Sequence, residues 1–330
     1  MARAGKLALP APTAVAQGKN PREVSAMTQR DHPPLTPEDI EREALPGESW
    51  EAAARRIARK RAEAGKSGTP PKPQNPAPAK TAQIIRLPFW PESQRGAPNE
   101  IVRSALFNAR NRKQKREYLA NVDIYVIGEG SITYTGEELR QDDETVWLHL
   151  IHLARNTPPG ELVEFGPHAF CKAVGWDASG KSYQRLRDCI TRLQATALGV
   201  YSKRLKEGLS LSMIPFFRWK NAEGHALKTY QVRIAPEMVE FFGEVHYTQV
   251  EWEQRLALPS GLASWLHGYF ASHREPFPVK LETIREGAGL TMERLDHLRE
   301  KVAAALDALR TVGFLVSWKI EKDLVYVVRA

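Results

Sequence analysis

The chain has 330 residues, and 42% of them are hydrophobic, which is enough to form the cores of two ordinary soluble domains. Lys and Arg total 47 against 39 Asp and Glu. The resulting net charge of +8 favours a polyanionic partner, nucleic acid before an acidic membrane surface, although a soluble protein can also be basic without one. No apolar run approaches the roughly 20 residues that span a bilayer. Pro10 and Pro12 interrupt any signal peptide, so we expect a cytoplasmic protein.

Two cysteines are too few for a disulfide framework in a chain of this length. Cys171 and Cys189 both lie on apolar faces of predicted helices. We therefore expect small, reduced core residues at both positions and no metal site.

Residues 1–98 hold most of the 23 prolines and little apolar surface, so we expect this region to be largely disordered. One helix is predicted inside it, over residues 46–65, because alanine and charged residues favour helix. Its basic residues either contact DNA phosphates or belong to a solvated helix with no function of its own. They are Arg55, Arg56, Arg59, Lys60 and Arg61.

From Asn99 onward, one pattern of elements occurs twice. Each copy predicts a helix that opens with Trp-Leu-His, a proline-containing turn, a short strand, a short helix, a long helix and a β hairpin. The first copy has its helices and strand at 147–149, 162–165, 169–174 and 181–197, and the second at 265–267, 278–281, 282–286 and 291–312. This order is typical of a winged helix-turn-helix. We therefore predict an α+β protein with two tandem winged helix-turn-helix domains, at 99–235 and 236–330.

Several residues predict where these helices begin and end. Thr135 with Glu138 fits a capping box before the first helix, and Thr291 fits an N-cap of the second long helix. Gly199 and Gly313 fit the C′ position after each long helix.

The acidic run Asp142, Asp143 and Glu144 suggests either a metal or acid-base site or a favourable helix start. It falls in the early turns of a predicted helix, where the helix dipole favours negative charge, so we interpret it as structural.

In a helix-turn-helix the second helix enters the major groove, so the polar faces of both long helices are expected to contact DNA. In the first they are Lys181, Ser182, Gln184, Arg185, Arg187 and Arg192, and in the second Arg294, His297, Glu300 and Lys301. The opposite faces carry apolar stripes: Leu186, Cys189, Ile190, Leu193 and Ala197 in the first helix, and Leu295, Leu298, Val302, Leu306 and Leu309 in the second. For any one polar residue, a merely solvated helix face is the alternative.

Further basic residues lie outside these helices. The predicted wings contribute Lys203, Arg204, Lys206, Lys319 and Lys322. The stretch from Arg103 to Arg116 adds a basic strip with Arg110, Arg112, Lys113 and Lys115. Such densities of positive charge are typical of phosphate contacts.

Residues 175–182 match the phosphate-loop pattern GxxxxGK[ST], so an NTP-dependent DNA enzyme is an alternative. A phosphate loop follows a buried parallel strand, whereas residues 168–174 here predict a short helix. We also find no alternating β/α pattern and no Ser-His-Asp or Cys-His arrangement. We therefore interpret the stretch as the turn of the helix-turn-helix and predict no catalysis, no cofactor and no metal.

Several stretches resemble the TrfA family of plasmid replication initiators. They are 103–107 with the basic residues after it, 132–147, 192–197, 246–248 and 269–282, in family order from about Pro98 to the C-terminus. The resemblance implies tandem winged helices that bind iterons (direct repeats at the origin) as monomers and melt adjacent AT-rich DNA, with contact to the single strands. It also implies cooperation with the host initiator, recruitment of the host replicative helicase, and copy control through an inactive dimer. A plasmid-encoded transcription repressor is the alternative within the DNA-binding class.

The family also carries a short peptide that binds the host sliding clamp, and the matching stretch here is 83–90. Gln83, Leu87 and Phe89 are the residues that the resemblance assigns to clamp binding. Gln83 stands one residue further from Leu87 than in the family pattern, and Pro88 interrupts it. Packing of Leu87, Phe89 and Trp90 onto the first domain is the alternative.

Overall fold

The computed structural model describes residues 43, 50–64, 86–128, 130–202, 207–242 and 246–330, and the chain forms two units, 1–81 and 82–330. The first unit contains helix α2 (Trp50–Ala64), which lies inside the predicted range 46–65. Most of the proline-rich region lies outside the described residues. Within the described ranges, every helix is too short or too polar to cross a bilayer.

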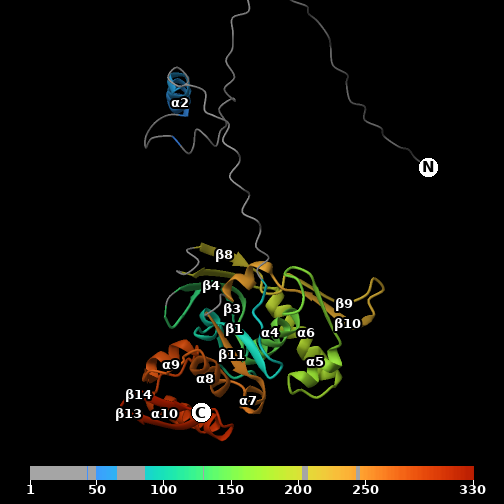
Figure 1. Cartoon of the computed structure of the whole chain (residues 1–330), viewed down its shortest axis with the longest axis vertical. Helices are drawn as coiled ribbons and strands as arrows, with labels where there is room; N and C mark the ends of the chain where they lie inside the picture. The colour runs from blue at the N-terminus through green and yellow to red at the C-terminus, as the bar shows by residue number, and fades with distance from the viewer. Residues whose placement is uncertain (1–42, 44–49, 65–85, 129, 203–206, 243–245) are drawn as a thin grey trace, which may run out of the picture. The chain divides into compact units, whose positions relative to one another are not determined.

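The second unit is a mixed α/β structure, and its helices and one of its sheets follow the first copy of the predicted pattern. Strands β6, β10 and β9 form an antiparallel sheet in that order, and α5 and α6 pack against each other beside α4. Figure 1 shows these helices together at one side, with the β9–β10 hairpin projecting beyond them. The elements are α4 (Gln141–Ala154), β6 (Leu162–Phe165), α5 (Pro167–Ala173), α6 (Gly180–Gln194), β9 (Phe216–Lys220) and β10 (Ala226–Arg233).

The same connectivity recurs near the C-terminus. Strands β12, β14 and β13 form an antiparallel sheet in that order, which matches β6, β10 and β9 position by position. Helix α10 packs on α8 and α9. The elements are α8 (Leu262–Ala271), β12 (Val279–Lys280), α9 (Leu281–Gly287), α10 (Leu295–Thr311), β13 (Leu315–Glu321) and β14 (Leu324–Arg329).

An antiparallel ribbon joins the two groups of helices. It consists of β1 (Gln94–Pro98) and β11 (Tyr247–Glu251), which are far apart in sequence. Strand β1 packs on α4 and strand β11 packs on α8, and Figure 1 shows the ribbon between the two groups.

The remaining elements complete the unit. Strands β3, β4, β7 and β8 form a four-stranded sheet, and β2 pairs with β5 in parallel. Their bounds are α3 (Asn99–Val102), β2 (Phe107–Asn108), β3 (Tyr118–Ile124), β4 (Ser131–Glu137), β5 (Leu139–Arg140), β7 (Ala197–Ser202), β8 (Glu207–Leu211), η1 (Pro236–Phe241) and α7 (Trp252–Ala257).

Two hydrophobic clusters form the cores of the second unit. The first is built around Trp90, Trp147 and Leu186 and extends in sequence to Trp252. The second lies around Phe270, with Ala109 and residues from Leu258 onward. Each cluster buries the apolar stripe of one long helix, which is the burial that the helical periodicity requires.

Two predicted stripe residues lie elsewhere. Leu186, Cys189, Ile190 and Leu193 are fully buried, but α6 ends at Gln194, so Ala197 is an exposed residue of β7. The stripe from Leu298 to Leu309 is also fully buried, but Leu295 is 40% exposed because it is the first residue of α10. Both predicted core cysteines are free and buried, as expected.

Three of the predicted helix boundaries are wrong. Thr135 lies in β4, where its Oγ1 accepts a hydrogen bond from the Asn121 amide, and α4 begins only at Gln141. Gly199 lies in β7, where its lack of a side chain leaves room for Thr133 Oγ1. Thr291 precedes α10, whose N-cap residue is Arg294.

The prediction for Gly313 is confirmed. Gly313 has φ +74° directly after α10, its amide bonds to the Arg310 carbonyl, and the Phe314 amide bonds to the Leu309 carbonyl. This pair of bonds is a Schellman motif, which needs a left-handed residue at C′.

Candidate nucleic-acid interface

Helix α6 presents its polar face along a basic hollow. Ser179 caps the helix by accepting a hydrogen bond from the Ser182 amide, and Lys181 and Gln184 are exposed. The hollow has a volume of about 580 Å³ and is lined by Arg112, Lys113, Arg116, Asp142, Lys181, Gln184, Arg185, Asp188 and Arg192. Six of these nine side chains are cationic, so the surface attracts anions.

Three arginines predicted to face DNA make intramolecular contacts. Arg185 stacks on the Trp176 ring, 3.8 Å from its centroid. Arg187 donates to the Tyr230 hydroxyl at 3.0 Å, and Arg192 binds the buried Asp143 through Nε and Nη2 at 3.0 and 2.8 Å. These contacts leave Lys181 and Gln184 as the most accessible polar side chains at the start of α6.

The stretch that matches the phosphate-loop pattern joins two helices. It follows α5, as expected, and the only parallel strand pair among the described residues is β2 with β5, which lies elsewhere in the sequence. The hydroxyl of Ser182 is buried and donates to Asp177 Oδ1 at 2.7 Å. A phosphate loop follows a strand, whereas this stretch is a turn that joins helix α5 to helix α6.

Helix α10 presents a mixed polar face near its start. Arg294 is 69% exposed and pairs with Asp296. His297, Glu300 and Lys301 are exposed as expected from the helical period. Lys301 also lines a hollow of about 520 Å³ together with Arg110 and Arg112.

The strands that follow the long helices differ from expectation in the first copy. Strand β7 pairs with β4 and with β8, and the hairpin that joins the β6 sheet is β9–β10. Lys203, Arg204 and Lys206 lie outside the described residues. The sequence did not lead us to assign Lys220 or the exposed Lys228, which both lie on the β9–β10 hairpin, to a wing. The alternation around Tyr230 and Val232 could have indicated this strand, because both side chains are buried.

The second hairpin carries its basic residues as predicted. Lys319 in β13 is exposed, pairs with Glu321 at 2.8 Å and lies over the Tyr326 ring. Lys322 lies in the turn before β14 with φ +53°.

The acidic run lies in the first turn of α4, as expected, but arginine side chains neutralise it. Arg116 donates to Asp142 at 3.0 Å and to Asp143 at 2.7 Å, and Arg255 donates to Glu144 at 3.0 Å. Burial and the neighbouring Asp142 charge raise the pKa of Asp143.

This network also explains the one group of potential metal ligands among the described residues. Ligand atoms of Asp142, Asp143 and Cys189 lie within 4.8 Å of one another. Burial raises the pKa of the Cys189 thiol, and guanidinium groups already bind both carboxylates. A protonated thiol is a poor metal ligand, so the cluster is better explained as buried ion pairs.

The segment that resembles a clamp-binding peptide is held at one end. Gln83 lies outside the described residues, Leu87 packs on the first cluster, and Phe89 is 81% exposed. Trp90 is fully buried and donates from Nε1 to His152 Nδ1 at 3.0 Å. Leu87 and Trp90 therefore pack onto the first cluster, as expected if this segment is structural, whereas Phe89 remains accessible.

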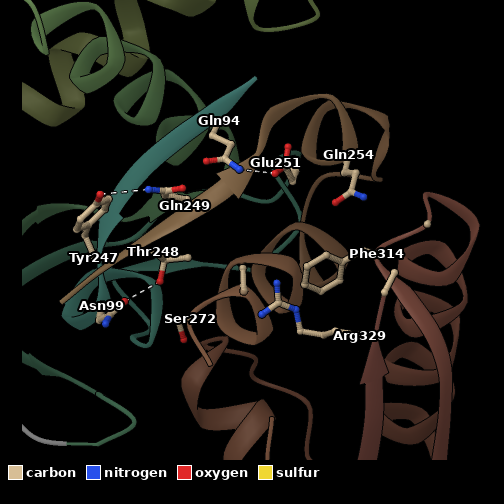
Figure 2. Close-up of a pocket in the computed structure, with 13 residues that line it drawn as sticks. Gln94, Asn99, Tyr247, Thr248, Gln249, Glu251, Gln254, Ser272, Phe314 and Arg329 are labelled. Carbon is tan, nitrogen blue, oxygen red and sulfur yellow. Dashed lines mark hydrogen bonds between the residues drawn. The ribbon is translucent and has the colours of Figure 1, made fainter. Parts of the chain in front are cut away.

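A separate polar hollow of about 570 Å³ lies beside the β1–β11 ribbon. Gln94 donates to Glu251 at 2.5 Å on one wall, and Arg329 and Phe314 form part of the opposite wall (Figure 2). Arg329 is the only cationic side chain in its lining, so this hollow differs in charge from the one beside α6.

The described residues thus define a mixed α/β protein in which one order of helices and strands occurs twice, each time with an exposed polar face on its longest helix. The TrfA protein family matches residues 52–329, and the chain belongs to this family. It is 40% identical over 242 residues to the plasmid replication initiator protein TrfA of Escherichia coli. That match covers 73% of this chain and 63% of the relative.

Solved structures give weaker likenesses. Domains 2 and 3 of RctB match with a TM-score of 0.48 and 14% identity, over 70% of this chain and 96% of that one. The Pi initiator protein in complex with iteron DNA matches with a TM-score of 0.41 and 12% identity, over 57% and 94%. These scores are too low to define the fold of this chain.

Proposed function

We propose that this chain is a plasmid replication initiator that binds iteron repeats through two tandem winged helix-turn-helix domains. It helps to open adjacent AT-rich DNA and recruits host replication proteins, among them the helicase, the host initiator and the sliding clamp. A dimer is the inactive form, and the protein acts on plasmid DNA in the cytoplasm without catalysis of its own.

The observation that carries this proposal is the repeated connectivity in a member of the TrfA family. In both copies a helix and a strand are followed by a short helix, a long helix and a hairpin that pairs with that strand. This is the arrangement in which a helix-turn-helix inserts its second helix into the major groove and a wing contacts the backbone. The two hydrophobic clusters support two domains, which we propose at 99–235 and 236–330. The first cluster also takes in residues from Met238 to Trp252, and the second starts at Leu258 apart from Ala109.

The proposed DNA contacts come from α6, α10 and the hairpins. In α6 they are Lys181 and Gln184, which are exposed. The less exposed residues Ser182, Arg185, Arg187 and Arg192 are also included. In α10 they are Arg294, His297, Glu300 and Lys301. On the hairpins they are Lys220, Lys228, Lys319 and Lys322, together with the β7–β8 connection at 203–206.

The alternatives differ in what the purified chain binds. An initiator binds direct repeats with one protomer on each, whereas a transcription repressor more often binds a palindrome as a dimer. We expect anisotropy titrations on repeat-containing and random duplexes, combined with sedimentation, to give one protomer per repeat. A dimer on a palindrome favours the repressor, and magnesium-dependent ATP binding abolished by Lys181→Ala favours the enzyme.

A further inference from the structure

We propose that residues 111–115 form a phosphate-binding loop that contacts the backbone of duplex DNA between α6 and α10, and that the buried Arg140 positions this loop. The inference rests on the proposed DNA-binding function and adds a third contact surface to the two helices. Three features of the loop support it: the hydrogen bonds to its carbonyls, its exposed positive charges and the hollows beside it.

Arg140 holds the loop from beneath. Its guanidinium is 1% exposed and donates to three loop carbonyls, those of Asn111 at 2.5 Å, Gln114 at 2.8 Å and Lys115 at 3.0 Å. Glu138 accepts a further bond from Arg140 at 2.9 Å and neutralises it. One rigid donor group thus fixes three backbone carbonyls, which preorganises a loop that has no regular secondary structure.

The cationic side chains at the two ends of this segment differ in role from the three between them. Arg110 and Arg116 point inward, to Glu138 and to Asp142 with Asp143. Arg112, Lys113 and Lys115 are exposed, and none of the three forms an ion pair with another described residue. The inward pair anchors the loop ends, and the outward three leave positive charge available to an anion.

The loop lies between the two long helices. Arg112 lines the hollow beside α6 together with Lys181, and it lines the hollow beside α10 together with Lys301. Burial lowers the pKa of Arg185, and the nearby positive charge of Arg112 lowers it further. Like charges so close together attract a phosphate group that can neutralise both.

The decisive experiment compares two charge-matched double variants. Arg112→Gln with Lys113→Gln removes two loop charges, and Arg274→Gln with Arg310→Gln removes two exposed charges that line none of these hollows. Anisotropy titrations on repeat-containing duplex at roughly 50 to 200 mM salt give the slope of log K against log salt. This slope is negative. We expect the loop variant to make it shallower by about 2, because each lost phosphate contact removes about 0.9, and we expect the control to leave it unchanged.

Arg140→Lys separates positioning from charge. It keeps the positive charge but loses the planar fork that binds three carbonyls. We expect it to weaken duplex binding, to speed amide exchange in residues 111–116 and to leave the far-UV circular dichroism spectrum unchanged. Binding that matches the wild type, with faster exchange in the loop, would overturn the positioning role.

The outcomes distinguish this inference from the proposed function. If the wild-type chain binds no repeat-containing duplex, the proposed function fails and the inference fails with it. If the wild type binds with a steep salt slope and the loop variant keeps that slope, only the inference is overturned. A loss confined to single-stranded DNA also overturns it, since the proposal commits to duplex.

Discussion

Arg255 in α7 donates from Nη2 to Oε2 of Glu144 in α4 at 3.0 Å, and both side chains are almost completely buried. The pair connects residues that are 111 positions apart. It also joins α4 of the first hydrophobic cluster to the segment that leads into the second. An ion pair buried in this way is costly to break on one side, because the remaining charge loses its partner.

We therefore expect Arg255→Met to lower the free energy of unfolding by about 3–5 kcal/mol. Glu144→Leu combined with Arg255→Met is expected to recover much of this loss, because apolar groups then replace both charges. Urea unfolding followed by circular dichroism measures both. Arg310→Met is the control, since its pair with Asp307 is exposed and contributes less than about 1 kcal/mol. Equal losses for the single and double variants would contradict the pairing.

Arg294 tests whether α10 reads base edges. Its guanidinium is exposed at the N-cap of α10, and the proposed function assigns it a base contact, which would discriminate between sequences. We expect Arg294→Ala to weaken binding to the cognate repeat by about 1–3 kcal/mol and to weaken binding to random duplex less. Competition titrations at fixed salt measure both affinities. An equal loss on the two duplexes would make Arg294 a phosphate contact only.

Gly313 tests the boundary after α10. Its φ of +74° disfavours any residue with a Cβ, although the space around it is open. We expect Gly313→Ala to cost about 1 kcal/mol of stability through the backbone alone. Gly180→Ala is the matched control, because Gly180 lies in the first turn of α6 with equally open space. Urea unfolding should show no loss for this control, and a similar loss in both would rule out the left-handed cap as the cause.

His267 predicts a pH dependence of stability. Burial, with the nearby Arg255 charge, lowers the pKa of His267 to about 3, well below its ordinary value. The unfolded chain therefore takes up a proton near pH 6.5 that the folded chain takes up only near pH 3. The contribution of His267 is complete above pH 7 and decreases as the pH falls, by about 2 kcal/mol at pH 5.

The measurement is the change in unfolding free energy between about pH 7 and pH 5. His267→Leu should make this change smaller, because leucine takes up no proton in either state. A pH dependence identical in the wild type and in His267→Leu would contradict the shifted pKa.

Much of the helical framework could be predicted from the sequence because its signals are local. The period of 3.6 residues identified the buried faces of α6 and α10 from Leu186 to Leu193 and from Leu298 to Leu309. Gly313 marked a helix end, since a left-handed residue is a property of a few neighbouring positions. The accessible face of α10 followed from the same period.

Strand pairing and buried charges were decided by the tertiary structure. The sequence does not reveal that β7–β8 pairs with β4 while β9–β10 pairs with β6, because each hairpin carries similar strand signals. Arg192 was expected on the DNA-facing side, yet it binds Asp143, which lies 49 positions earlier. The sequence also gave no sign that Arg140 donates hydrogen bonds to three backbone carbonyls. Hydrogen bonds and ion pairs of this kind depend on which distant residues the fold brings together, and helical periodicity carries no information about that.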